Sequence, residues 1–145
     1  MSKTEDFLTS KDEQEIVEAI KIAEENTSGE IRVHLENHSD KDAIQRAQEV
    51  FNSLKMFETQ ARNGVLFYVN IAGHQFAIIG DEGINKVVPE DFWESTKNIV
   101  IENFKNQNYK NGLVAGIEKA GEQLKRYFPY QSNDINELTN EISKE

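Results

Sequence analysis

The sequence contains no cysteine, and that absence excludes several kinds of chemistry at once. Disulfide bonds, thiolate zinc sites, iron–sulfur clusters and cysteine nucleophiles all need a thiol. Proline is also scarce, with two residues in 145, while 37% of the residues are hydrophobic and 29% are charged. This balance argues against a disordered or fibrous chain and predicts an ordinary globular domain with its own hydrophobic core.

Long hydrophobic runs are missing as well. The start, MSKTEDFLTSKDEQE, has no apolar segment of the signal-peptide kind, and no stretch approaches the about 18 apolar residues of a membrane span. We therefore expect a cytoplasmic chain without a membrane span. The glycine-rich phosphate-binding motifs and the G-x-S-x-G motif of serine hydrolases are absent, so nucleotide binding and that type of hydrolysis have no support.

Basic residues are outnumbered, since 16 lysines and arginines stand against 26 acidic residues and give a formal charge of −10. Such a surface repels nucleic-acid phosphates and anionic lipid headgroups, so nucleic acid is not an expected partner. The same excess favours hard cations wherever several carboxylates converge. Most acidic residues on such a surface are nevertheless simply solvated.

The spacing of hydrophobic residues predicts helices that alternate with strands. A capping box over Ser10–Glu13 precedes the first helix, and Asn63-Gly64 and Ala72-Gly73 mark turns. In chain order, the predicted elements are a helix over about 11–26, a strand over 30–36, a helix from Ser39 or Asp40 to about 55, strands over 65–69 and 76–79, a helix from Pro89, a helix from about 112 to Pro129, and a short helix over about 133–143.

This order predicts a single α/β domain, a three-layer αβα sandwich with a short mixed central β-sheet covered by helices on both faces. Strand 65–69 is apolar throughout and is expected at the centre of the sheet, paired with strand 76–79 as a hairpin. Strand 30–36 alternates strictly, which predicts a half-exposed strand with His34 on its polar face. His38 falls in the following loop, so this pair does not favour a histidine metal site.

The segment Gly80-Asp81-Glu82-Gly83 is the most suggestive local feature. Carboxylates beside glycines at the end of a strand can direct side-chain and backbone oxygens toward one cation. An ordinary acidic turn is the alternative explanation, because the segment lacks the ligand spacing of an EF-hand. Arg62 next to a turn could bind an anion, although pairing with a nearby carboxylate is the expected role in so acidic a chain.

Several segments, taken in order, resemble the TPM domain family, which is named for thylakoid-lumen, photosystem-repair and membrane-tethered proteins. The resemblance covers about residues 10–129 and implies an αβα sandwich in which divalent cations, usually calcium, tie together two crossing loops at one end of the sheet. Some relatives are described as phosphatases. The segments that carry the resemblance are Thr27-Ser28-Gly29-Glu30-Ile31-Arg32-Val33, Phe51 to Met56, Thr59-x-x-Arg62-Asn63-Gly64-Val65-Leu66, Phe76-Ala77-Ile78-Ile79-Gly80-Asp81-x-Gly83-Ile84, Trp93, and Phe104-x-x-x-x-Tyr109-x-x-Gly112-Leu113 with Gly116-Ile117.

On this sequence, the resemblance places the crossing loops before Asn63-Gly64 and over residues 80–91, and it assigns the family's acidic position after Ser-Gly to Glu30. We interpret residues 1–145 as one stand-alone TPM-type domain that binds calcium, with magnesium as the alternative cation. Cation binding would order the loops and alter the surface that an unidentified protein partner meets. The candidate metal ligands are Glu30, Asp81, Asn63, Glu82 and Asp91, and no catalytic residue is assigned.

Two alternatives to this non-enzymatic interpretation stay open. In a metal-dependent phosphatase, the same ions would bind phosphate and activate water, which requires an open coordination position and an accessible cleft. In a protein-interaction module, the metals would only stabilise the fold beneath the binding surface.

Overall fold

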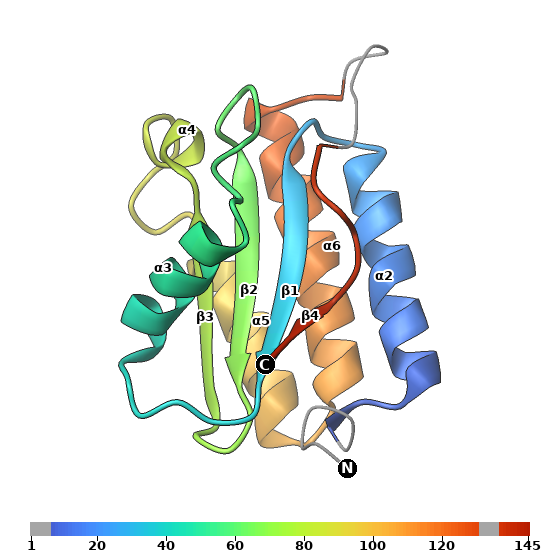
Figure 1. The fold of residues 1–145 in the computed structure, drawn as a ribbon. Helices are drawn as coiled ribbons and strands as arrows, with labels where there is room; N and C mark the ends of the chain where they lie inside the picture. The colour runs from blue at the N-terminus through green and yellow to red at the C-terminus, as the bar shows by residue number, and fades with distance from the viewer. Residues whose placement is uncertain (1–6, 131–136) are drawn as a thin grey trace.

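The computed structural model describes residues 7–130 and 137–145. A sheet lies between two layers of helix (Figure 1). One face of the sheet packs against α3 (Ala43–Ser53), and the opposite face packs against α2 (Ser10–Glu24), α5 (Glu94–Lys105) and α6 (Tyr109–Tyr127). The predicted three-layer αβα architecture is therefore confirmed.

The sheet has 4 described strands in the order β3-β2-β1-β4. β1 (Glu30–Glu36) lies parallel to both β2 (Gly64–Asn70) and β4 (Ser143–Lys144), whereas β2 and β3 (Gln75–Gly80) form the predicted antiparallel hairpin. Glu30 pairs with Gly64, and Gly80 pairs with Val65 on the other side of β2. The residues that begin β1 and those that follow β3 consequently meet at one end of the sheet.

Alternation along the strands divides the buried residues between two hydrophobic cores. Ile31, Val33 and Leu35 of β1 face the layer that contains α2 and α6. On the other face, Leu66 and Tyr68 of β2 pack with residues of α3. Every residue of β2 is buried, as its unbroken apolar sequence predicts.

Local capping explains where the first two described helices begin. The capping box of α2 consists of Thr9 and Asp12, one residue earlier than predicted, with Asp12 N donating to Thr9 Oγ1 over 3.0 Å. Asp42, rather than Ser39 or Asp40, caps α3, because its carboxylate accepts from the backbone N–H of Ile44 at 3.1 Å. Both caps satisfy amides that the helix itself leaves without partners.

β1 is not half-exposed, so the prediction from its alternation was wrong. The strand lies between β2 and β4, and His34 and Glu36 on its polar side are 0% and 4% exposed. The C-terminal segment covers this side, running along β1 in red in Figure 1. The polar residues of this alternating strand are therefore buried. In most alternating strands, the polar positions face solvent.

The predicted C-terminal helix over about 133–143 falls partly outside the described residues, since the description resumes at 137. Within the described part, residues 137–142 are not helical and Ser143–Lys144 form β4. Glu145 N donates to Leu35 O at 2.9 Å, and Asn37 N donates to Glu145 O at 2.9 Å. The backbone groups on the edge of β1 that does not pair with β2 are available as partners. Hydrogen bonds to this edge favour a strand over the helix that the weak pattern of the segment predicts.

The segment after β3 also differs from the prediction. It contains a short helix, α4 (Glu82–Asn85), and α5 begins at Glu94 rather than at Pro89. Between them the chain forms turns, with Phe92 N donating to Pro89 O at 3.1 Å, and Phe92 is only 7% exposed. Burial of this aromatic ring fixes the turn before the helix starts. None of the helices in the described residues is both long and apolar enough for a membrane span.

Candidate metal site at the crossing loops

Two loops cross at the end of the sheet where β1 begins and β3 ends. Gly83 N donates to Arg62 O over 2.9 Å, and an added Cβ on Gly83 would lie 2.2 Å from Ala61 O. Only glycine permits so close an approach between two backbones. Arg62 adopts a positive φ of 52°, a backbone conformation that is uncommon for residues other than glycine, at the point where the first loop contacts the second.

Asp81 is brought to this end of the sheet, where its carboxylate is already engaged. Arg62 donates to it twice, from Nε to Oδ2 at 2.8 Å and from Nη2 to Oδ1 at 2.9 Å. Asp81 also caps α4 by accepting from Glu82 N at 2.8 Å. The Glu82 carboxylate accepts from Arg62 Nη1 at 3.1 Å. Arg62 thus neutralises both predicted ligands. Their contacts in the structure are those of an acidic turn paired with an arginine, which was the alternative to a metal-binding loop.

Glu30 and Asn63 form a second group in which two oxygens have no such partner. Glu30 N donates to Asn63 O over 3.2 Å, and the two residues are 3% and 2% exposed. Glu30 Oε1 accepts from Leu138 N at 2.6 Å, and Asn63 Nδ2 donates to Ser28 Oγ at 3.3 Å. Among the described residues, Glu30 Oε2 and Asn63 Oδ1 are buried without a hydrogen-bond partner. Buried acceptors are rarely left in this state, and a bound cation is one way to satisfy them.

The electrostatics of this group point in the same direction. Burial raises the pKa of Glu30 to about 7, and the nearby Glu137 carboxylate raises it further, against the lowering effect of the Leu138 backbone N–H. Burial likewise raises the pKa of Glu24 to about 8, although its carboxylate accepts from Ile31 N at 2.9 Å. Among the described residues, Glu24 and Glu137 thus both lie close enough to Glu30 to act on it, and none of the three forms an ion pair with a lysine or arginine. A carboxylate, an amide oxygen and their acidic neighbours suit a hard cation such as calcium.

The five predicted ligands are not brought to one point. Glu30 begins β1 and Asp81 follows β3, and β2 lies between these two strands, so the two backbones lie about two strand spacings, or roughly 10 Å, apart. Asp91 is exposed and lines a groove between α5 and α6 with Phe92 and Arg126. The structure thus pairs Glu30 with Asn63, pairs Asp81 with Glu82, and leaves Asp91 apart from both groups.

Sequence reasoning missed Glu24 and Glu137 as neighbours of Glu30. Glu24 ends α2, and a short reversal of the chain returns Glu30 beside it. That reversal, marked by Thr27-Ser28-Gly29, was the available signal for Glu24. Glu137 is brought in by the C-terminal segment, more than a hundred residues along the chain, and local patterns carry no sign of that contact.

The fold and the crossing loops define a class of protein, an α/β/α sandwich with two loops in backbone contact at one end of its sheet. The family model of the TPM domain matches residues 1–123. The chain belongs to the TPM domain family. In a comparison with curated proteins, no match was found.

Solved structures agree with this assignment. The NMR structure of the BA42 protein from the psychrophilic bacterium Bizionia argentinensis is similar to this chain, with 55% identity, a TM-score of 0.93, and coverage of 100% of both chains. The N-terminal domain of the cg2496 protein from Corynebacterium glutamicum shares the fold, with a TM-score of 0.64 and 14% identity over 95% of this chain and 80% of that one. The N-terminal domain of a protein from P. gingivalis shares it too, with a TM-score of 0.67 and 15% identity over 88% and 83% of the two chains.

Proposed function

We propose that this chain is a divalent-cation-binding domain, with calcium as the preferred ion and magnesium as the alternative, and that Glu30 and Asn63 are its principal ligands. The observation that supports this assignment is the pair of buried, unpartnered oxygens, Glu30 Oε2 and Asn63 Oδ1, at the end of the sheet. Both atoms are hard oxygen ligands of the type that calcium takes. The chain has no thiolate to favour a softer metal there.

Cation binding would act on the loops through charge. A cation beside Glu30 would favour the ionised carboxylates of Glu24, Glu30 and Glu137, which otherwise repel one another. Asn63 follows Arg62 in the first crossing loop, and Arg62 O holds Gly83 of the second loop. An ion on Asn63 would therefore restrain both loops and the surface that they present to a partner. This supports a regulatory or interaction role rather than catalysis.

Asp81 and Glu82 are secondary ligands in this proposal, because a cation would reach them only after Arg62 releases its hydrogen bonds. Asp91 is the weakest of the five, since it lies apart from both carboxylate groups. The phosphatase alternative gains no support from Arg62. A phosphate would need a free guanidinium, and this one is occupied by two carboxylates.

A calcium titration followed by calorimetry and by backbone NMR shifts tests the proposal. The shifts are expected at Gly29–Ile31 and at residues 62–64, on either side of the unpartnered oxygens. Glu30→Gln should remove most of the calcium affinity with little change of shape, because an anionic ligand is replaced by a neutral one. Glu18→Gln, on the exposed side of α2, is the matched control for general surface charge. Equal calcium affinity in Glu30→Gln and in the unaltered chain would exclude Glu30 as a ligand and remove the basis of the proposal.

A further inference from the structure

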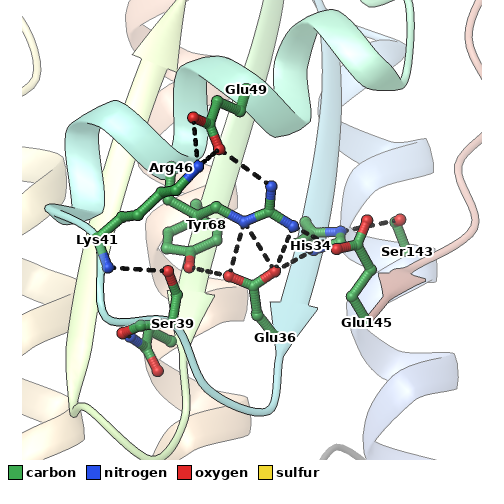
Figure 2. Close-up of polar contacts among 10 residues, drawn as sticks. His34, Glu36, Ser39, Lys41, Arg46, Glu49, Tyr68, Ser143 and Glu145 are labelled. Carbon is green, nitrogen blue, oxygen red and sulfur yellow. Dashed lines mark hydrogen bonds and ion pairs between the residues drawn. The ribbon is translucent and has the colours of Figure 1, made fainter.

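A second polar cluster lies at the opposite end of β1, on the side of the sheet that faces α3 (Figure 2). Glu36, which is 4% exposed, is at its centre. Arg46 of α3 donates to Glu36 from Nε at 2.9 Å and from Nη2 at 2.6 Å, and Tyr68 donates its hydroxyl at 2.5 Å. The guanidinium also pairs with Glu145 of the C-terminal segment and, at 3.3 Å, with Glu49.

His34, two residues before Glu36 in β1, is the buried member of the same cluster. Its side chain is 0% exposed and its ring stacks beside Tyr68, with ring centroids 6.0 Å apart and an interplanar angle of 9°. Nδ1 lies 2.9 Å from Ser143 Oγ, in hydrogen-bond contact. Nε2 has no hydrogen-bond partner among the described residues, and Glu36 Oε2 is 3.8 Å from it, beyond hydrogen-bond range. The cluster therefore contains a fully buried imidazole nitrogen that lies 3.8 Å from the Glu36 carboxylate and has no hydrogen-bond partner among the described residues.

We propose that His34 Nε2 and the carboxylates of Glu36 and Glu145 form a second metal site, distinct from the crossing loops, that takes a transition-metal cation of the zinc type. Ligand atoms of the three residues lie within 4.8 Å of one another. One imidazole nitrogen and two carboxylate oxygens form a donor set that zinc accepts, and calcium does not favour nitrogen. Ser143 orients the ring through Nδ1, as partners of metal-binding histidines commonly do.

The protonation state of His34 suits this role. Burial lowers the pKa of His34 to about 4, which outweighs the raising effect of Glu36. The imidazole is accordingly neutral near pH 7, and a neutral imidazole is the form that binds metals. Protonation therefore does not compete with the metal for Nε2 in that range.

Arg46 is the cation that holds this position in the structure, so a metal must displace it from Glu145 and share Glu36 with it. The side chain of Arg46 is 21% exposed, and Glu49 next to it on the same helix is 37% exposed. The Arg46 guanidinium already contacts Glu49 at 3.3 Å, so it would keep this partner after displacement without unfolding α3. This exchange makes the site weaker than an open one, and removal of the Arg46 charge should strengthen it.

Zinc binding, measured by calorimetry and by the imidazole 15N shifts of the folded chain, tests this inference. We expect one zinc ion to shift the Nε2 resonance of His34, and we expect Glu145→Gln to weaken binding at least about tenfold. Glu145 is exposed, so this variant tests the site even if His34→Gln, which alters a buried residue, folds poorly. Arg46→Gln should bind zinc more tightly than the unaltered chain does.

Control variants separate this site from the alternatives. His38→Gln removes an exposed histidine that pairs with Asp40 at 2.8 Å and should leave zinc affinity unchanged. Glu30→Gln should also leave it unchanged, so that failure of the calcium proposal and failure of this one are distinguishable. Zinc affinity that is unaffected by both Glu145→Gln and His34→Gln would overturn the inference. Binding seen only in Arg46→Gln would overturn it as well, because Arg46 would then be a permanent occupant.

Discussion

Glu30 and Glu36 begin and end the same strand, and both are almost completely buried, at 3% and 4% exposure. Their charge states nevertheless differ. Burial raises the pKa of Glu30 to about 7. Burial would also raise that of Glu36, but hydrogen bonds from Arg46 and Tyr68 reverse the effect and lower its pKa to about 2. The partners of a buried carboxylate, rather than its burial, decide whether it stays ionised.

The comparison suggests different requirements at the two ends of β1. At the Glu36 end, the compensating charge is part of the chain and comes from α3. At the Glu30 end, the described neighbours include the carboxylates of Glu24 and Glu137. A cation from solution would supply there what Arg46 supplies at the other end. The following predictions test this contrast, beginning with the largest expected effect.

Removal of the built-in cation should have the largest effect. Arg46→Gln leaves Glu36 buried without its charged partner, and breaking a buried ion pair in this way costs about 3 kcal/mol. Urea unfolding at pH 7 measures the loss. The double variant Arg46→Gln with Glu36→Gln should recover part of it, because the uncompensated charge is gone. An Arg46→Gln variant as stable as the unaltered chain would show that Glu36 does not depend on this guanidinium.

Addition of calcium should have the opposite effect at the Glu30 end. Calcium that binds only the folded chain stabilises it by RT ln(1 + [L]/Kd), which is about 2.7 kcal/mol at a hundredfold excess over Kd. The melting temperature measured with and without calcium checks this, with Glu30→Gln as the variant that should not respond. If calcium raised the melting temperature of Glu30→Gln by the same amount, the ion would bind elsewhere.

The two ends should also respond to pH in opposite directions. Glu24 and Glu30 have folded pKa values of about 8 and about 7, above the usual value of 4.5, so their contribution is full below about 4.5 and is lost as pH rises toward 8. Glu36 and His34 have lowered pKa values of about 2 and about 4. Their contributions are complete above 4.5 and 6.5, respectively, and are lost as pH falls. Unfolding free energies measured from pH 2 to 8 distinguish the loss of stability at acid pH, from Glu36 and His34, from the loss at alkaline pH, from Glu24 and Glu30.

Variants at Glu30 sharpen the pH test. Glu30→Gln should reduce the alkaline loss of stability without changing the acid side, and calcium should reduce it in the unaltered chain. Calcium affinity itself should rise from pH 6 to pH 8, because the acidic groups must ionise before they bind the ion. A calcium affinity independent of pH over this range would contradict the assignment of Glu30.

Much of the fold could be predicted from the sequence, because its patterns are local. The hairpin of β2 and β3 follows from two apolar runs around a turn, and the stripe from Leu113 to Leu124 gives α6. The polar face of β1 could not be placed. Its alternation normally indicates exposure, and the segment that covers it comes from the other end of the chain, where Ser143 meets His34.

The candidate sites show the same division between local and distant information. Glu30 and Asp81 could be placed at one end of the sheet, since Glu30 begins one strand and Asp81 directly follows another. Their partners could not be assigned from periodicity. The turn at Arg62 depends on a positive φ of 52°, and the pairing of Glu36 with Arg46 depends on how α3 crosses the sheet. Such contacts follow from tertiary packing and leave no repeat in the sequence.

The smallest expected effect is that of Asp81→Asn on calcium affinity. Because Arg62 already compensates Asp81, the aspartate should contribute less to cation binding than Glu30 does. Asn keeps the shape and can still cap α4, so the fold should change little. Without the Asp81 carboxylate as its partner, the positive charge of Arg62 should repel calcium from the loops. The calcium affinity should therefore fall modestly. Calorimetric titration of Asp81→Asn beside Glu30→Gln at one ionic strength gives the ranking. A larger loss in Asp81→Asn would mean that the ion displaces Arg62 and binds Asp81 directly, and the ligand set would then centre on the second crossing loop.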